Sequence, residues 1–530
     1  MTFGDSLPVL KGWYDECIYS SHHHRCTSES QPLPTRLLFV GPATNPVLQL
    51  VVPPAGQAGI YAALSHCWGT SQHAARTTKA NLHDAQKEIT MSRLPKTFLD
   101  AVCVVRELGL EYLWIDSLCI IQDDEEDWQR ESAAMANVFS NAHVTLAATA
   151  SQDSEGGCLF DREPAKHVVT SADASKAVYI RYPAEERKSL LQSPLYQRGW
   201  VLQEMVLSRR TVHFAQDQLF WHCCSRLTSE DGFFDAALGV TYSDLQSPQK
   251  AHESWWTWIE DYSMRQLTRS NDKFAALAGL TKAFPHGGKP LAGLWLDDIH
   301  FGILWCAREG SARAEMPHIP SWSWASVDGP VRAISARDTP VWKDHSHTLT
   351  THQMRVVDST VEWSGEMLAS DIRHASLRVE AKVALVVTAV EADQDYPTRQ
   401  YVGMYRFLNY RRFAKLFHLL PLITDFDNNS PGYSHGHGCF DVTSETPEPG
   451  SRVLCLLVST SSHCGYTCRV GYDEHESLNT NCEHLLHNVL LIETTGQPDE
   501  FRRIGLGTIR ARQDEPDFFS DVDTMELTLV

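Results

Sequence analysis

The clearest hydrophobic pattern in the chain predicts a buried strand followed by an amphipathic helix. Residues 112–115 form an apolar run rich in aromatic and β-branched side chains, which is typical of a strand. The acidic cluster at 123–127 is typical of a helix N-terminus, which favours negative charge. The apolar positions that follow share one helical face: Trp128, Met135, Val138 and Phe139. Glu131 lies on the same face, and a buried carboxylate is costly unless it is paired or has a chemical role.

The neighbouring segments repeat this alternation. Four further apolar runs predict strands at 33–40, 47–52, 61–69 and 143–148. Helices are expected at 78–89 and 98–108. The order strand, helix, strand, helix, strand indicates a parallel sheet with helices on its faces. Ligands bind at the carboxyl ends of such strands, so Asp116 and residues 65–68 would meet at that edge.

The remainder of the chain changes from helical to β patterns. Two short strands are expected at 210–214 and 219–223, helices at 255–267 and 272–284, and a compact aromatic strand at 320–326. Most apolar runs after residue 370 predict strands. The expected division is an N-terminal extension, a core domain, a helical and aromatic extension packed on the core, and a β-rich C-terminal region: 1–55, 56–230, 231–330 and 331–530.

Composition excludes some classes of protein. The chain has 530 residues, 43% of them hydrophobic and 21% charged, which is ordinary for a globular protein of several domains. A net charge of -20 argues against nucleic acid as a partner, because phosphate binding needs a basic surface. No apolar run approaches a membrane span, and residues 1–10 lack the features of a signal peptide. The 14 cysteines show no regular pattern, which favours reduced thiols and a cytoplasmic location.

Two groups of cysteine and histidine raise the question of zinc. The first contains Cys17, His22, His23, His24 and Cys26, and the alternative reading is a short helix with a polar loop. Because no second cysteine pair follows nearby, we expect no metal there. The second contains His463, Cys464, Cys468, Cys482 and His484, whose spacing fits a zinc pattern only loosely. The chain also lacks G-x-G-x-x-G, Walker A and H-E-x-x-H motifs.

Three blocks in a fixed order carry a family resemblance. Residues 63–69 (ALSHCWG), 113–123 (LWIDSLCIIQD) and 198–204 (RGWVLQE) closely resemble the signature blocks of the fungal heterokaryon incompatibility (HET) domain, over about 61–204. The resemblance implies a fungal, intracellular protein that triggers cell death when genetically different hyphae fuse. HET domains have been proposed as remote relatives of TIR domains, which implies an α/β fold with a flavodoxin/TIR-like parallel-sheet core.

The TIR relationship also implies a catalytic residue. Some TIR domains hydrolyse NAD with a glutamate in a Trp-Cys-x-x-Glu context. Here Trp128 and Glu131 share a helix face, but the cysteine is missing and the glutamate comes one position early. Glu131 would stabilise the positive charge that develops on the ribose as nicotinamide leaves. The alternative is a structural ion pair with Arg198 or Arg130.

Further residues are expected to line a substrate site. Asp116 would accept hydrogen bonds from ribose hydroxyls or cap the following turn, and Arg198 would hold a phosphate or pair with an acid. The other lining candidates are Ser65, His66, Trp68, Trp128, Trp200 and Glu204. Since side chains of a strand alternate, Ser65 and Cys67 should face one side and His66 the other.

Three functions remain open at this level. The first is an effector of heterokaryon incompatibility and programmed cell death that hydrolyses NAD, with NAD as substrate and no firmly expected cofactor. The second is an enzyme of a fungal secondary-metabolite pathway that acts on a small molecule. The third is a non-catalytic signalling module that binds a fungal protein partner.

Overall fold

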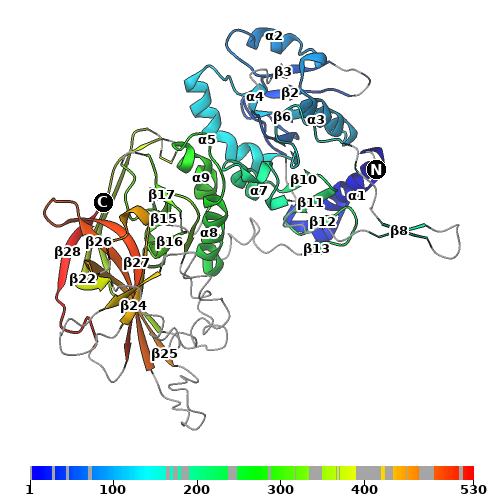
Figure 1. The fold of residues 1–530 in the computed structure, drawn as a ribbon. Coiled ribbons are helices and arrows are strands. Elements are labelled where there is room, and N and C mark those ends of the chain that lie inside the picture. Colours follow the sequence, from blue (N-terminus) through cyan, green and yellow to red (C-terminus); the bar gives the residue numbers. More distant parts are fainter. Residues whose placement is uncertain are drawn as a thin grey trace. The chain divides into compact units, whose positions relative to one another are not determined.

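The computed structural model describes most of the chain. The described residues are 3–26, 30–42, 44, 47–69, 75–160, 162, 167–170, 177–180, 190–236, 248–284, 288–308, 310–316, 318–333, 349–365, 367–368, 370–388, 419–423, 434–448, 450–464, 483–512 and 517–530. They group into two compact units, 1–254 with 265–286, and 255–264 with 287–530 (Figure 1). The expected division into four segments stays a prediction.

The first unit is built on a mixed sheet. Its strand order is β13 (Asp235–Ala236), β12 (Leu227–Ser229), β11 (Leu219–Cys223), β10 (Arg210–Phe214), β7 (Val144–Ala147), β5 (Ala62–Ser65), β6 (Tyr112–Trp114), β2 (Leu37–Phe39) and β3 (Gln49–Val51). The four strands β6, β5, β7 and β10 are parallel, as the alternation of strands and helices predicts. The α/β class is therefore confirmed.

The sheet is mixed, because antiparallel strands flank the parallel core on both sides. Strands β11, β12 and β13 follow β10 as an antiparallel meander, and β2 and β3 pair antiparallel at the other edge. The connections explain this, because only residues 215–218 separate β10 from β11. So short a connection joins antiparallel neighbours, whereas a parallel crossover needs a dozen residues or more.

Helices cover both faces of this sheet. Leu64 and Leu113 point to the face covered by α1 (Phe3–Tyr19) and α3 (Lys96–Glu107). Ala63 and Trp114 point to the opposite face and pack beneath α5 (Glu125–Asn141). On that face α5 also contacts α7 (Val201–Leu207) and α9 (Asp272–Ala283). The alternation of apolar side chains along each strand thus builds two cores, one on each side.

Shorter elements complete the first unit. They are η1 (Ser21–Cys26), β1 (Gln31–Pro32), β4 (Ala58–Gly59), α2 (Leu82–Lys87), η2 (Met91–Arg93), α4 (Asp116–Cys119), β8 (His167–Thr170), β9 (Ala177–Ile180) and η3 (Leu195–Gln197). Helix α8 (Pro248–Ser263) contributes residues to both units.

The second unit contains the β-rich region. Its large antiparallel sheet has the order β20 (Leu349–His352), β25 (Arg452–Cys464), β26 (Glu483–Thr494), β27 (Glu500–Arg512), β24 (Ser434–Phe440), β23 (Leu419–Ile423), β22 (Ile372–Thr388) and β21 (Arg355–Trp363), with β28 (Thr524–Leu529) beside β22 and β27. Because β22 also pairs with β25, the sheet closes on itself. This confirms the expected β-rich C-terminal region.

The rest of the second unit consists of short elements. They are β14 (Pro290–Leu291), β15 (Leu294–Trp295), η5 (Leu296–Asp298), α10 (Ile299–Gly302), β16 (Trp305–Ala307), β17 (Ala312–Arg313), η6 (Trp324–Ser326), β18 (Val327–Asp328), β19 (Val331–Ala333) and η10 (Thr443–Glu445). The expected strand at 320–326 is wrong, since these residues form a turn and η6. The Ser323 hydroxyl accepts a hydrogen bond from the Ala325 N–H, a local contact that competes with strand pairing.

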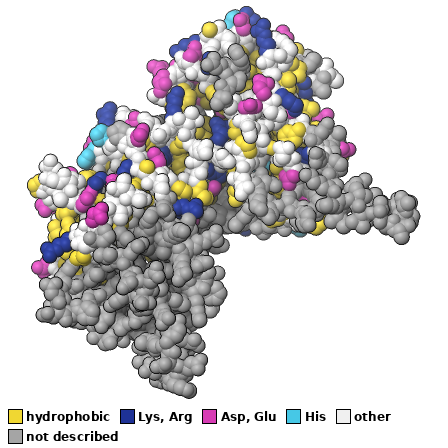
Figure 2. All heavy atoms as spheres, in the orientation of Figure 1, with side chains coloured by type: hydrophobic (Ala, Val, Ile, Leu, Met, Phe, Trp, Pro, Cys, Tyr) yellow, Lys and Arg dark blue, Asp and Glu magenta, His cyan; other side chains and the backbone are white. Residues whose placement is uncertain are grey.

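The surface mixes charges of both signs. On the face that Figure 2 shows, acidic and basic side chains are interspersed with apolar ones. Among the described residues, no helix combines the length and the apolar character that a membrane span requires.

Candidate functional site at the carboxyl edge of the parallel strands

Strands β5 and β6 bring two of the predicted site segments together. Ala62 pairs with Leu113 and Ala63 with Trp114, so the carboxyl ends of the two strands are level. The indole N–H of Trp68 donates a hydrogen bond of 2.7 Å to Oδ2 of Asp116. The expected meeting of the 65–68 segment with Asp116 is therefore observed. Asp116 also caps the turn that follows, because its Oδ1 accepts the Ser117 N–H at 2.7 Å.

The side chains that end β5 alternate between two environments. The His66 ring lies edge-on to Phe98 of α3, with ring centroids 5.0 Å apart, and its Nδ1 is 3.8 Å from Oδ1 of Asp116. Cys67 instead packs with Val201 and Met205 of α7. Neighbouring positions on a strand point to opposite faces, so His66 and Cys67 do not form a catalytic pair.

Arg198 and Glu204 reach the same edge from the segment around α7. Nη1 of Arg198 donates to the carbonyl oxygen of His66, which closes the segment over the end of β5. The segment at Arg265 and Gln266 holds the backbone around Arg198 in place. The Gly199 N–H donates to the Gln266 carbonyl at 2.8 Å, and Nη1 of Arg265 donates to the Arg198 carbonyl at 3.4 Å.

Burial changes the protonation of two groups in this cluster. Burial raises the pKa of Glu204 to about 7, although Arg198 and the Ser65 hydroxyl act in the opposite direction. Burial lowers the pKa of His66 to about 4, against the attraction of Asp116. At neutral pH the site therefore holds a neutral imidazole and a carboxyl group that is about half ionised.

Some side chains of the cluster are buried and others are partly exposed to solvent. Ser65, His66 and Glu204 are 1%, 2% and 5% exposed, whereas the Asp116 side chain is 21% exposed and Trp68 and Arg198 are half-buried. Both ring nitrogens of His66 are buried without a hydrogen-bond partner among the described residues. Buried polar atoms are normally paired, so this edge has unused capacity to bind a polar ligand.

Glu131 contacts a different set of residues. It is 2% exposed on α5, and its Oε1 is 3.6 Å from Nη2 of Arg36 and 3.5 Å from Nε of Arg130. Asp127 joins this group through ion pairs with both arginines. Arg130 was one of the two partners expected for a structural ion pair. The catalytic role of Glu131 stays a prediction, and its described contacts are those of a buried charge network.

Two of the three predicted tryptophans lie on the face of the sheet that α5 covers. Trp128 is partly buried against the core formed by Trp114, Met135 and Phe139. Trp200 also packs on that core, and its indole N–H donates to Asp272 at 3.2 Å. Their described contacts are therefore with the core and with α9.

Two arginines near these residues were not anticipated. Arg36 sits in the segment 33–40, where a charged residue within an apolar run is a signal for a buried ion pair. Arg265 reaches the site from beyond α8, and its guanidinium lies 5.2 Å from the centroid of the Tyr196 ring. Nothing in the local sequence indicates that second contact, because it depends on the tertiary fold.

Gly69 gives a direct test of the loop that positions Trp68. Its φ is +75°, and a Cβ there would lie 2.3 Å from Cβ of Asp153. We expect Gly69→Ala to lower the free energy of unfolding by about 2–4 kcal/mol, through backbone strain and steric overlap together. Gly109→Ala is the matched control, because Gly109 has φ +73° with no atom within 4 Å of its Cβ position.

Urea denaturation of both variants measures the difference. The control should lose only the strain energy, about 1–2 kcal/mol. Equal decreases in the free energy of unfolding for the two variants would show that the contact with Asp153 does not contribute to the cost of Gly69→Ala.

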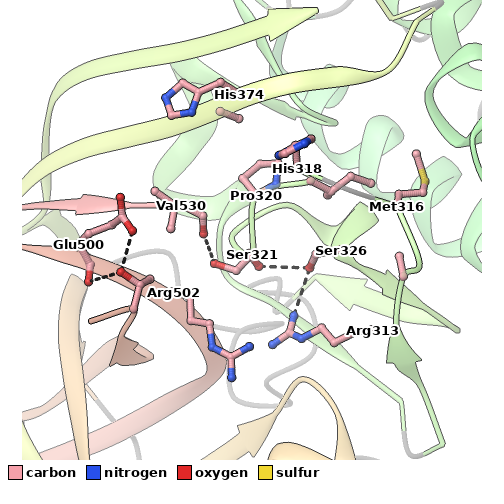
Figure 3. Close-up of a pocket in the computed structure, with 14 residues that line it drawn as sticks. Arg313, Met316, His318, Pro320, Ser321, Ser326, His374, Glu500, Arg502 and Val530 are labelled. Atoms are coloured by element: carbon pink, nitrogen blue, oxygen red, sulfur yellow. Dashed lines mark hydrogen bonds between the residues drawn. The ribbon is translucent and has the colours of Figure 1, made fainter. Parts of the chain in front are cut away.

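The second unit contains a hollow of about 440 Å³. Figure 3 shows its labelled lining residues, among which Ser321 is bonded to Val530 and to Ser326. The backbone N–H of Ser321 donates to the Val530 carbonyl at 3.0 Å, and Nη1 of Arg313 donates to the Ser326 hydroxyl at 3.3 Å. Since all its lining residues belong to the second unit, this hollow is separate from the cluster around Asp116.

The two cysteine and histidine groups of the sequence differ in how far the structure describes them. The second cysteine and histidine group, at 463–484, lies outside the residues whose side chains are described. Among the described side chains, a grouping suited to a metal ion occurs at Cys17, His23, Cys26 and Cys223, and it contains none of the residues of the sheet edge.

Comparison with known proteins identifies the region that carries this edge. Residues 61–204 match the family model for heterokaryon incompatibility protein (HET). The match begins just before β5 and ends at Glu204, so it contains Ser65, His66, Trp68, Asp116 and Arg198. No curated protein and no solved structure matches the chain. The chain therefore carries a heterokaryon incompatibility (HET) domain over residues 61–204.

Proposed function

We propose that the HET domain of this protein hydrolyses NAD at the carboxyl edge of its parallel strands, and that it acts in this way as an effector of heterokaryon incompatibility. The observation that carries the proposal is the buried Glu204 carboxyl group. It lies beside Arg198 and Ser65 and has a pKa raised to about 7 by burial. Perturbed carboxyl groups in such positions are typical of catalytic sites.

The arrangement of the parallel strands supports a nucleotide ligand. The parallel strands lie side by side in the order β6, β5, β7, β10. Numbered by their order along the chain, this is 2-1-3-4. The flavodoxin-like sheet starts with the same order, and its ligand binds where the order reverses. Here that reversal lies between β5 and β7, next to Ser65 and His66.

Each residue of the cluster has a place in this reaction. Asp116 would accept hydrogen bonds from ribose hydroxyls, the half-buried Trp68 would pack against the nicotinamide ring, and Arg198 would attract the pyrophosphate. Ionised Glu204 would stabilise the oxocarbenium-like charge on the ribose. The His66 ring, neutral at pH 7, packs against Phe98, and its unpaired nitrogens would bind a polar group of the ligand.

The atoms of the reaction balance without a cofactor. The bond between the ribose anomeric carbon and the nicotinamide nitrogen breaks, and its electron pair goes to the nicotinamide ring. A water oxygen then bonds to the anomeric carbon. The products are ADP-ribose, nicotinamide and one proton, which a group such as Glu204 can pass to solvent.

Nicotinamide release from NAD by the purified full chain tests the proposal. Because Glu204 must be ionised, the rate should rise with pH through about 7 and level off above it. Glu204→Gln should lower the rate by about a hundredfold or more and remove this pH dependence. The matched control is Glu126→Gln, since Glu126 is exposed on the first turn of α5.

Glu131→Gln in the same assay separates the two carboxylates. We expect it to keep turnover, with Glu204→Gln losing it. The reverse result would move catalysis to Glu131, as the TIR resemblance implies. Absence of nicotinamide release by the folded wild-type chain would overturn the proposal and favour a non-catalytic module.

A further inference from the structure

A second polar cluster lies in the first unit, away from the residues of the proposed reaction. It contains Cys17 near the end of α1, His23 and Cys26 on η1, and Cys223 at the end of β11. All four side chains are buried, and their ligand atoms lie within 4.8 Å of one another. Cys17, Cys26 and Cys223 are free thiols.

The spacing of these atoms fits tetrahedral zinc. With ordinary zinc bond lengths to sulfur and nitrogen, a tetrahedral site places a thiolate and an imidazole nitrogen about 3.6 Å apart. Nδ1 of His23 is 3.5 Å from Sγ of Cys223 and 3.7 Å from Sγ of Cys26. Both distances agree with the separation that a tetrahedral zinc site requires between these two kinds of ligand atom.

Arg210 provides an independent argument from charge. It is 2% exposed, and its Nε lies 3.3 Å from Sγ of Cys17, while Nη2 and Nη1 donate to the carbonyls of Cys26 and His143 at 2.6 and 3.1 Å. Among the described residues, no carboxylate pairs with it. A buried guanidinium without an anion is costly. Three thiolates and a neutral histidine around Zn²⁺ carry one net negative charge, which Arg210 would neutralise.

We propose that Cys17, His23, Cys26 and Cys223 bind a structural zinc ion that fastens α1 and η1 to β11. Four protein ligands close a tetrahedral site, which leaves no open position for catalysis. The neighbouring Cys224 contacts Cys26 but is not among the four clustered ligands, and its thiol also donates to the Arg209 carbonyl at 3.7 Å. Cys223 is 200 residues from His23, and spacing along the chain therefore disfavoured zinc although the fold brings Cys223 to the other three ligands.

Metal analysis of the purified full chain is the first test. After expression with added zinc, mass spectrometry of the metals should find one zinc per chain and no iron. Cys223→Ser should lose most of this zinc. Cys103→Ser, at an exposed cysteine of α3, should retain it.

Cobalt substitution provides a readout that does not depend on Cys223→Ser folding. Wild-type protein loaded with Co²⁺ should show visible bands of a tetrahedral site and a thiolate-to-cobalt charge-transfer band. In His23→Cys the site gains a thiolate, so the charge-transfer intensity should rise by about a third. The thiols should react slowly with a thiol reagent until a chelator removes the metal.

Three results would overturn the proposal. They are folded wild-type protein without stoichiometric zinc that also fails to bind cobalt, thiol reactivity that is the same with and without a chelator, and a disulfide between two of the three cysteines in protein prepared under reducing conditions.

Discussion

Arg503→Met is expected to lower the free energy of unfolding of the second unit by about 3–5 kcal/mol, because it removes the hydrogen-bonded partner of the buried Asp441 carboxylate and leaves it only Arg313, at 3.7 Å. Arg503 is completely buried and donates to both oxygens of Asp441, at 3.2 and 2.9 Å. It also donates to the carbonyl of Ile303 at 2.7 Å and to that of Trp305, and its guanidinium lies 3.5 Å from the Trp305 ring centroid. Methionine replaces the volume but none of these bonds.

The neighbouring Arg502 supplies the control. Its side chain is 43% exposed and pairs with Glu493 and Glu445, so Arg502→Met should cost less than about 1 kcal/mol. Urea denaturation gives the totals. Strand β24 ends just before Asp441, and β27 contains Arg503. Amide hydrogen exchange in these two strands shows whether the loss of stability falls in the second unit. Similar losses for the two variants would contradict the assigned role of Arg503.

Local hydrophobic patterns predicted the elements that position the site. The apolar run at 112–115 and the helical face that carries Glu131 appear as β6 and α5. These predictions succeed because strand and helix periods are properties of neighbouring residues. The level ends of β5 and β6 follow from their parallel pairing, which the order of elements implies.

Contacts between distant segments could not be predicted in the same way. Arg36 meets Asp127 across the fold, and Cys223 meets His23. The periodic pattern of a helix or strand carries no information about such pairs. The only signal in the sequence is a residue whose type is unusual for its surroundings, such as a charged residue in an apolar run. The antiparallel flanks of the first sheet were missed for a related reason, since pattern gives the strands but the length of each connection decides their direction.

The buried network around Arg36 is expected to matter as much to the first unit as Arg503 does to the second. Arg36 is 6% exposed, and its Nη2 lies beside both Asp127 and Glu131, while its Nε donates to the Cys119 carbonyl at 2.5 Å. Arg36→Met would leave two buried carboxylates with less positive charge, at a cost of about 3–5 kcal/mol. Arg93→Met, at an exposed arginine of η2, should change stability by less than about 0.5 kcal/mol.

A double-mutant cycle between Arg36 and Glu131 decides what the carboxylate on α5 does. A structural pair predicts that Glu131→Gln is less harmful when Arg36 is already methionine, with a coupling energy of about 0.5–3 kcal/mol. The same variants should then release nicotinamide from NAD at the wild-type rate wherever they are folded. A catalytic Glu131 predicts the opposite combination, because its removal would abolish turnover while the coupling to Arg36 stays near zero. Unfolding and turnover measured on one set of proteins therefore assign Glu131 to the charge network or to the reaction.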